Sequence, residues 1–346
     1  MRSVNAYAAQ NATTPLAPFN IERREPEDFD VHVEILYCGV CHSDLHQIRD
    51  EWGGAIFPMV PGHEIVGRVL RTGPSVTKFK AGDLAGVGCL VDSCRTCDNC
   101  RQGLEQYCSN GAVGTYNSMD KVGRPTYGGY SKEIVVHEDF VLRVPDNLAL
   151  EAVAPLLCAG ITTYSPLRHW KISKGHRVGI LGLGGLGHMG VKFAASFGAE
   201  VTMLSTSASK EVDARRLGAH HFALTTDTSV TKKLRGYFDL ILDTVSAPHD
   251  YSMYLKMLRT NGTQICVGAP PTPVEMNVFG LLANRRGIAG SMIGGLPETQ
   301  EMLDYCSEHN IVSDVEVIRI SEINTAYERM LKGDVRYRFV IDMATL

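Results

Sequence analysis

The sequence predicts an α/β protein in which a mostly β front part precedes a doubly wound parallel sheet. Up to about residue 150, short alternations of apolar and polar residues are separated by Gly and Pro, as is typical of half-buried strands. From residue 177 onward, apolar strands instead alternate with helical segments, which favours a parallel sheet covered by helices. A chain of 346 residues also exceeds what one hydrophobic core usually serves, so we expect two domains.

The elements follow in order. The front part shows its clearest strand at residues 31–39, and further strands are expected within KAGDLAGVG and GGYSKEIVVHEDFVLRVP. In the second part, RVGIL and EVTMLST read as strands, and others are expected at 238–245, 263–269 and 287–295. The tail reads as helix, strand, helix, strand, without showing by itself which domain it joins.

Composition excludes some functions. The chain is 44% hydrophobic and 21% charged with a net charge of -4, which is ordinary for a globular protein and gives no reason to expect a nucleic-acid partner. No apolar run approaches the roughly 18 residues that span a bilayer, so no membrane partner is expected. The first residues carry an Arg but no apolar signal-peptide core. We therefore expect a cytoplasmic protein.

Four cysteines fall within seventeen residues of the front part, in the spacing C-x2-C-x2-C-x7-C. They could form disulfides, a metal site or a redox switch. Disulfides are rare in a reducing compartment, where clustered cysteines more often bind metal. Four thiolates would fill every position around zinc, so this would be a structural and not a catalytic site. The expected ligands are Cys94, Cys97, Cys100 and Cys108.

A glycine-rich turn stands between an apolar strand and a helix, in the G-x-G-x-x-G pattern. Glycines there permit a tight turn and let the backbone approach a pyrophosphate at the helix N-terminus. A turn without a ligand is the alternative, but the strand–turn–helix context favours a dinucleotide site. The residues concerned are Gly182, Leu183, Gly184, Gly185, Leu186 and Gly187.

The strand after this helix indicates which dinucleotide binds. An NAD site usually has an acidic residue at the end of that strand, to hold the adenosine ribose. Here the strand ends in Ser205, Thr206 and Ser207, followed by Lys210, while Glu200 stands at its opposite end. Hydroxyls and an ammonium would bind a 2′-phosphate that a carboxylate would repel. We therefore predict NADP(H).

Together the motifs resemble the zinc-containing medium-chain alcohol dehydrogenases. The resemblance rests on CGVCHSDLH (38–46), GHE (62–64), CAGITTY (158–164), the four-cysteine loop and GLGGLG, and covers nearly the whole chain. SMIGG and the Ser-Thr-Ser strand end are similar to the cinnamyl-alcohol-dehydrogenase branch, especially its bacterial broad-specificity NADPH-dependent aldehyde reductases.

The resemblance implies a GroES-like catalytic domain at 1–150 and 296–346, and a Rossmann domain at 151–295. It implies reversible hydride transfer between NADP(H) and aldehydes or primary alcohols, mainly the reduction of aromatic and medium-chain aldehydes, with one catalytic and one structural zinc. It also implies a homodimer that pairs near GIAGSMIGG.

Site roles are carried over from the family position by position. The catalytic zinc ligands would be Cys41, His63 and Cys158, with Glu64 able to approach the metal. Asp44 would orient His63, as metal-bound imidazoles require. The remaining roles are proton transfer by Ser43 and His46, and cofactor contacts by Ser43, Thr162, Thr244, Gly268, Ser291, Met292 and Ile293.

Two alternatives compete with this interpretation. Quinone reductases share the fold but lack both the Cys41/His63/Cys158 set and the four-cysteine lobe. A zinc module with a nucleotide-sensing domain would bind nucleic acid or sense redox state, yet no Lys/Arg stripe accompanies the zinc loop. For His46 alone, a solvated loop histidine is the other interpretation. The other thiols are expected to be packed or idle: Cys38, Cys89, Cys266 and Cys306.

Overall fold

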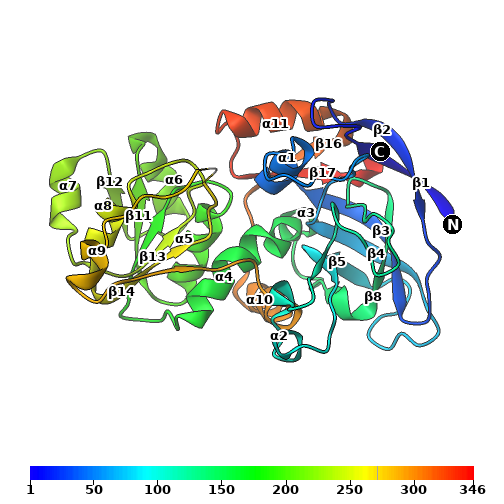
Figure 1. Cartoon of the computed structure of the whole chain (residues 1–346), viewed down its shortest axis with the longest axis horizontal. Coiled ribbons are helices and arrows are strands. Elements are labelled where there is room, and N and C mark those ends of the chain that lie inside the picture. Colours follow the sequence, from blue (N-terminus) through cyan, green and yellow to red (C-terminus); the bar gives the residue numbers. More distant parts are fainter. Residues whose placement is uncertain (271) are drawn as a thin grey trace. The chain divides into compact units, whose positions relative to one another are not determined.

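The structure, a computed structural model, describes residues 1–270 and 272–346 (Figure 1). The chain divides into two compact units. Unit 1 comprises Met1–Ile161 and Gly294–Leu346, and unit 2 comprises Thr162–Ile293. None of the helices among the described residues is long and apolar enough to cross a membrane.

Unit 1 is built on a seven-stranded sheet in the order β16-β17-β3-β4-β5-β9, with β8 pairing β3 as well. The tail belongs to this sheet, because β17 runs antiparallel to β3 with Ile341 opposite Cys38. Its strands are β3 (Asp30–Gly39), β4 (Ile65–Thr72), β5 (Leu84–Val87), β8 (Glu133–His137), β9 (Leu142–Arg143), β16 (Val315–Arg319) and β17 (Arg338–Asp342). Two small sheets accompany it, β1 (Arg2–Ala8) with β2 (Ala17–Arg23), and β6 (Leu90–Asp92) with β7 (Val113–Gly114).

Short helices connect these strands in unit 1. Among them, α11 buries Ile323, Ala326, Tyr327 and Met330, a spacing that places all four on one face. The helices are α1 (His42–Ile48), α2 (Asp98–Arg101), η1 (Glu105–Tyr107), η2 (Glu138–Phe140), α3 (Leu150–Val153), η3 (Ala154–Leu157), α10 (Leu296–His309), η5 (Ile320–Glu322), α11 (Ile323–Leu331) and η6 (Met343–Thr345). Another helix, α4 (Ala159–His169), begins in unit 1 and continues into unit 2.

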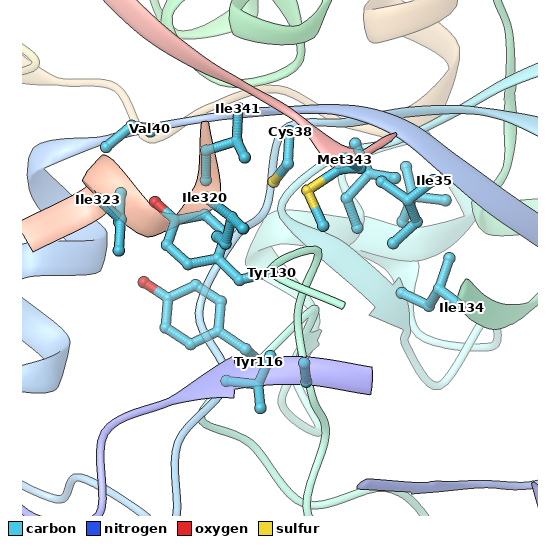
Figure 2. Packing of buried hydrophobic residues seen from close by; sticks show 14 of the residues in the cluster. Ile35, Cys38, Val40, Tyr116, Tyr130, Ile134, Ile320, Ile323, Ile341 and Met343 are labelled. Atoms are coloured by element: carbon cyan, nitrogen blue, oxygen red, sulfur yellow. The ribbon is translucent and has the colours of Figure 1, made fainter. Parts of the chain in front are cut away.

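The core of unit 1 draws on both ends of the chain. Figure 2 shows Ile35 and Cys38 of β3 among buried side chains that include Ile341 and Met343 from the tail. Each fully buried side chain of this kind contributes about 1.5–3 kcal/mol relative to exposure. Tyr130 lies in the same cluster, so the core contains a hydroxyl group, which needs a hydrogen-bond partner.

Unit 2 confirms the expected doubly wound parallel sheet. Its six strands run in the order β12-β11-β10-β13-β14-β15, and all five pairings are parallel. The strand order reverses between β10 and β13, where folds of this type bind nucleotides beyond the carboxyl ends of the strands. The strands are β10 (Arg177–Leu181), β11 (Glu200–Ser205), β12 (His221–Leu224), β13 (Phe238–Asp243), β14 (Leu258–Cys266) and β15 (Gly287–Gly290). The helices are α5 (Gly187–Ser196), η4 (Ala208–Lys210), α6 (Glu211–Arg216), α7 (Thr228–Lys233), α8 (Tyr251–Met257) and α9 (Phe279–Leu282).

The division between the units falls later than the sequence suggested. Residues 151–161, which we expected in the second domain, belong to unit 1. The reason is apolar packing: Leu156 and Leu157 are buried, and a side chain at Gly86 of β5 would meet Leu157 at 3.3 Å. Cys158 is consequently held in unit 1. The strand expected at 287–295 is also shorter, because β15 ends at Gly290.

Candidate active site

Four potential metal ligands converge in unit 1. Cys41 precedes α1, His63 and Glu64 precede β4, and Cys158 follows η3. One ligand atom from each of these side chains lies within 4.8 Å of the others. Three segments far apart in the sequence thus bring two thiols, an imidazole and a carboxylate to one point, and three of the four residues are buried.

The spacing of the two sulfurs suits a metal and not a disulfide. Cys41 Sγ lies 4.0 Å from Cys158 Sγ. Two thiolates on one tetrahedral zinc, each at about 2.3 Å, would lie about 3.8 Å apart, whereas a disulfide requires about 2.05 Å. Hydrogen bonding with Cys158, followed by the effects of His63 and Arg338, lowers the pKa of Cys41 well below its usual value. The cluster therefore favours the thiolate that a metal needs.

Asp44 organises this cluster from a fully buried position. It is the third residue of α1, and its carboxylate accepts the Cys41 N–H at 2.9 Å, which caps the helix. The other oxygen accepts the Gly62 N–H and faces His63 Nδ1, both at 3.1 Å. With the Nδ1 proton directed at this carboxylate, His63 Nε2 keeps the lone pair for a metal. The Tyr130 hydroxyl also donates to Asp44, at 3.4 Å.

Glu64 is held by a buried arginine. Glu64 Oε1 pairs with the Arg338 guanidinium, which also donates to the Val40 carbonyl at 2.8 Å. The second oxygen, Oε2, is buried and has no hydrogen-bond partner among the described residues. Burial raises the pKa of Glu64 to about 7, although Arg338 opposes the shift. An orphaned carboxylate oxygen inside a ligand cluster is what a bound cation would satisfy, so these residues fit a zinc ion.

The position of the Glu64 carboxylate also explains why residue 39 is a glycine. A side chain at Gly39, the last residue of β3, would place its Cβ 1.9 Å from Glu64 Oε2. Only glycine lets the carboxylate reach this position.

The four-cysteine loop forms a second ligand cluster. Its four sulfurs lie within 4.8 Å of one another, with Cys94 Sγ 3.8 Å and Cys97 Sγ 3.5 Å from Cys100 Sγ. Backbone N–H groups point at these sulfurs, including those of Cys94 toward Cys108 Sγ and of Cys97 toward Cys94 Sγ. Hydrogen bonds from Thr96 and then Cys97 lower the pKa of Cys94 to about 5. All four cysteines are free thiols, and their geometry fits a closed tetrahedral site.

The residues expected to carry the proton lie on and beside α1. Ser43 Oγ is 3.6 Å from Cys41 Sγ. His46 Nδ1 lies 2.5 Å from Glu51 Oε2, and its ring stacks on Trp52 with centroids 5.0 Å apart. The His46 side chain is 25% exposed. A hydroxyl beside the cluster and a partly exposed imidazole on the same helix are thus compatible with proton transfer between the metal site and solvent.

The glycine-rich turn in unit 2 is tightly constrained. Gly182 has φ of 89°, and a side chain on it would meet Val245 Cγ2 at 2.7 Å. A Cβ on Gly187 would lie 1.8 Å from the Gly182 carbonyl oxygen, whereas one on Gly184 would meet nothing within 4 Å. The Thr244 hydroxyl donates to the carbonyls of Leu181 and Gly182, at 2.8 and 3.1 Å. This packing brings the first turn of α5 directly after β10, the geometry that dinucleotide sites use.

The serines after β11 form a polar turn. Ser205 Oγ accepts the Ser207 N–H at 3.2 Å, and Ser207 Oγ lies 2.9 Å from Ser209 Oγ. Thr206 and Ser207 are exposed, and Lys210 ends η4. Glu200 stands at the other end of β11, where it contacts His221 and Tyr237. No carboxylate therefore occupies residues 205–210.

The other expected cofactor residues also lie in unit 2. Gly268 packs so closely that a Cβ would lie 2.5 Å from the Val245 carbonyl oxygen. Ser291 donates its N–H to the Cys266 carbonyl at 3.2 Å, and Ile293 has φ of 41°. Thr162 is buried and opens this unit. The metal-binding candidates, Ser43 and His46 belong to unit 1.

Several residues of the site were missed in the sequence. Arg338 could have been noticed as a charge at an inward position of an apolar strand. Tyr116 stacks on the His63 ring, with centroids 5.7 Å apart, and no local pattern marks it. Cys89, which we expected to be packed or idle, donates to the Leu157 carbonyl at 3.7 Å, and its neighbour Cys158 lowers its pKa. Cys89 is thus a packed thiol beside a metal-ligand candidate.

Comparison with known proteins decides the family. Residues 27–146 match the model of the alcohol dehydrogenase GroES-like domain, and residues 185–308 match that of zinc-binding dehydrogenases. The chain is 56% identical to NADP-dependent alcohol dehydrogenase C 1 of Mycolicibacterium smegmatis, covering 100% of this chain and 99% of that protein. It is also 56% identical to the aldehyde reductase YahK of Escherichia coli, over 99% of each.

Solved structures agree. A cinnamyl alcohol dehydrogenase from Sorghum bicolor matches with a TM-score of 0.96 and 46% identity, covering 99% of this chain and 98% of that one. The Helicobacter pylori enzyme, solved with NADP(H), matches with a TM-score of 0.93 and 42% identity, over 99% and 98%. The chain belongs to the zinc-containing medium-chain alcohol dehydrogenases, with their GroES-like and Rossmann domains, and is an oxidoreductase.

Proposed function

We propose that the protein catalyses reversible hydride transfer between NADP(H) and aldehydes or primary alcohols, chiefly reducing aromatic and medium-chain aldehydes. The single observation that carries the proposal is the convergence of Cys41, His63, Glu64 and Cys158 within 4.8 Å. Two cysteines and a histidine are the ligand set of a catalytic zinc that leaves its fourth position open. A zinc held there polarises the aldehyde oxygen as a Lewis acid.

The protein's own residues prepare and protonate the substrate. Asp44 fixes the orientation of His63. Arg338 keeps Glu64 beside the metal ligands, and its guanidinium charge compensates the negative charge of the Glu64 carboxylate. Ser43 hydrogen-bonds the substrate oxygen and donates the proton to it. His46 replaces that proton from solvent, because an imidazole can both accept and donate a proton and this side chain is partly exposed. Glu51 orients the His46 ring.

Unit 2 binds NADP(H), whose nicotinamide supplies the hydride. The Gly182–Gly187 turn approaches the pyrophosphate at the start of α5. Ser205, Thr206, Ser207 and Lys210 hold the 2′-phosphate, since they offer hydroxyls and an ammonium where an NAD enzyme offers a carboxylate. Thr162, Thr244, Gly268 and the Ser291–Ile293 segment complete the cofactor contacts.

The four-cysteine loop holds a structural zinc. Its ligands fill a tetrahedron, and this leaves no position for substrate. The loop from Asp92 to Cys108 contains only α2, η1 and the end of β6, so a metal stabilises a segment that has little secondary structure of its own.

A second copy of the chain is the proposed partner. β15 is an edge strand of the described sheet, and apolar side chains of α9, which precedes it in the chain, are exposed, including Phe279 at 74% and Leu282 at 68%. An open edge and an apolar surface favour pairing with another sheet. Light scattering should give twice the chain mass of 37.8 kDa, and Ile288→Lys, on β15, should give the monomer.

We also assign the protein to the cytoplasm. All ten cysteines are free, and the two proposed zinc sites need six of them as thiolates. A reducing compartment keeps them available. Fractionation of the source cells followed by immunodetection tests this assignment, and recovery outside the cytoplasmic fraction would contradict it.

The activity is tested by aldehyde-dependent oxidation of NADPH and of NADH, with benzaldehyde as substrate and protein purified without chelator. We expect a kcat/KM at least tenfold higher with NADPH. Equal use of NADH would retain the enzyme class but remove the assignment of Ser205–Ser207 and Lys210. No turnover with benzaldehyde, hexanal or butanal, in protein that contains both zinc ions, would contradict the proposed substrate class.

A further inference from the structure

His249 occupies a position in unit 2 that neither the sequence motifs nor the family comparison explains. It follows β13 at the carboxyl edge of the parallel sheet, and its side chain is 13% exposed. One nitrogen, Nε2, lies 2.8 Å from Asp243 Oδ2, and the other, Nδ1, lies 2.9 Å from the Ala247 carbonyl oxygen. The ring stacks on Tyr251, with centroids 4.3 Å apart.

These two contacts determine the protonation state of the imidazole. A carbonyl oxygen can only accept a hydrogen bond, so Nδ1 must donate. The Asp243 carboxylate is fully buried and already accepts from the Gln264 side-chain amide at 2.8 Å and from the Val245 N–H at 3.2 Å. An ionised carboxylate can only accept hydrogen bonds, so Nε2, which faces it, must donate too. An imidazole that donates from both nitrogens is a cation.

The charges around His249 are consistent with a cation. Burial disfavours the charged ring, but the hydrogen bonds to Asp243 and Ala247 and the nearby Asp250 raise the pKa of His249 above its usual value. Burial also raises the pKa of Cys266, on β14, to about 12, so this thiol stays neutral. Tyr251 and Tyr254 of α8 are neutral for the same reason, since burial raises the pKa of each.

The segment held by His249 is the one that packs on the nucleotide turn. Val245 contacts both Gly182 and Gly268 so closely that neither could carry a side chain. Thr244 donates to the Gly182 carbonyl at 3.1 Å, and Ser246 Oγ accepts the Ala269 N–H at 3.3 Å. Residues 244–249 therefore connect the glycine-rich turn to the end of β14. The contact of His249 with Asp243, the last residue of β13, attaches the end of this segment to the sheet.

We propose that His249 is a positioning residue for the cofactor, which as an imidazolium fastens the 244–249 segment to Asp243 and so holds the nucleotide pocket in its binding shape. A neutral imidazole has one N–H and can keep only one of the two bonds. Losing the proton at high pH therefore releases either Ala247 or Asp243. The inference rests on the proposed binding of NADP(H) to this unit, and predicts that cofactor affinity declines as His249 deprotonates.

Two measurements on the full-length, zinc-loaded protein test the proposal. The first is nitrogen-15 NMR of the imidazoles, with His249→Gln used to assign the resonance. We expect both ring nitrogens of His249 to be protonated at pH 7 and to titrate only above the ordinary histidine value of about 6.5. A neutral tautomer at pH 7 would overturn the proposal.

The second is the dissociation constant of NADPH from pH 6 to pH 9.5, followed by nucleotide fluorescence. We expect wild-type affinity to fall about threefold to tenfold through the His249 titration, as loss of one charge-assisted hydrogen bond implies. His249→Gln should bind weakly at all these pH values, with kcat at saturating NADPH nearly unchanged. His249→Phe, which keeps the stacking on Tyr251, is a second variant if the first does not fold.

The control is His221→Gln, which removes an exposed imidazole paired with Glu200 at the amino end of β12 and should retain the wild-type profile. If His249→Gln shows the same pH dependence as the wild type, the role of His249 is overturned while the proposed function stands. If the wild type binds neither NADPH nor NADH, the proposed function fails, and the role of His249 fails with it.

Discussion

Arg338, on β17 of the C-terminal tail, forms an ion pair with Glu64, which stands 274 residues earlier in the chain beside His63. Both side chains are almost completely buried. The tail is therefore part of the metal site as well as of the sheet, and the second bond of Arg338, to the Val40 carbonyl at 2.8 Å, fixes the guanidinium next to the segment that leads to Cys41.

Removing Arg338 should destabilise the protein strongly. Arg338→Met leaves the Glu64 carboxylate buried without its partner, and breaking a buried pair in this way costs about 3–5 kcal/mol. We expect the free energy of unfolding, measured with urea, to fall by that order, and Arg338→Lys to recover part of the loss. Arg71→Met is the control, because Arg71 and Glu25 form a half-exposed ion pair that solvent screens, so its loss should cost far less. Equal effects of the two substitutions would contradict this role of Arg338.

Loss of the structural zinc should be separable from loss of the catalytic one. Cys100→Ala removes one of four ligands, and we expect the zinc content, measured by mass spectrometry, to fall from two ions to one per chain. The melting temperature should fall because metal binding contributes folding free energy in such loops. Unchanged zinc content would show that the four cysteines do not form one site.

The proton path can be tested at His46. His46→Asn should lower kcat roughly tenfold to hundredfold at neutral pH, the low end of what a general acid–base group contributes because water can replace it in part. Added imidazole should restore some of the rate. Glu51→Gln, which weakens the orientation of the ring, should have a smaller effect in the same direction. A wild-type rate and pH profile in His46→Asn would indicate the solvated loop histidine instead.

Cofactor selectivity should depend on Lys210. In Lys210→Glu the new carboxylate would repel the 2′-phosphate, so we expect kcat/KM for NADPH to fall at least roughly tenfold while that for NADH changes less. Lys232→Glu, at the end of α7, gives the same change of charge elsewhere in unit 2 and should be neutral. If both lysines affect NADPH equally, the effect is one of net charge, and the assignment of Lys210 is wrong.

Stability should vary with pH through His249. Its folded pKa is raised, so the folded state binds the proton more tightly than the unfolded state does. The stabilisation is therefore fully present below the unfolded value of about 6.5 and is lost as pH rises through the folded value. The difference in unfolding free energy between wild type and His249→Gln should be larger at pH 6 than at pH 9. A constant difference would exclude this linkage.

The sequence predicted those parts of the molecule that are specified locally. The cysteine spacing between Cys94 and Cys108 places four thiols on one short loop, and Gly182 to Gly187 lie between one strand and one helix. In both cases neighbouring residues suffice to define the ligand geometry. The parallel sheet of unit 2 was predicted for the same reason, because each strand and its helix are adjacent in the chain.

Features that depend on distant pairing could not be predicted from local sequence patterns. Cys41, His63 and Cys158 meet only after β3, β4 and η3 have packed, so their selection required the family resemblance. Arg338 reaches Glu64 because β17 pairs with β3, a register that no local pattern specifies. The unit boundary was placed too early for a similar reason: Leu157 belongs to unit 1 through its contact with β5.

The most direct test of the proposed centre is to measure zinc content and NADPH-dependent benzaldehyde reduction on the same preparations of wild type, Cys158→Ala and Cys89→Ala. Cys89 contacts Cys158 but is outside the four-ligand group, so it is the matched comparison. We predict two zinc ions and full turnover in the wild type, one zinc and a loss of at least about a thousandfold in Cys158→Ala, as removal of Lewis-acid catalysis implies, and two zinc ions with measurable turnover in Cys89→Ala. Two zinc ions and wild-type turnover in Cys158→Ala would contradict the assignment of the catalytic metal to this site.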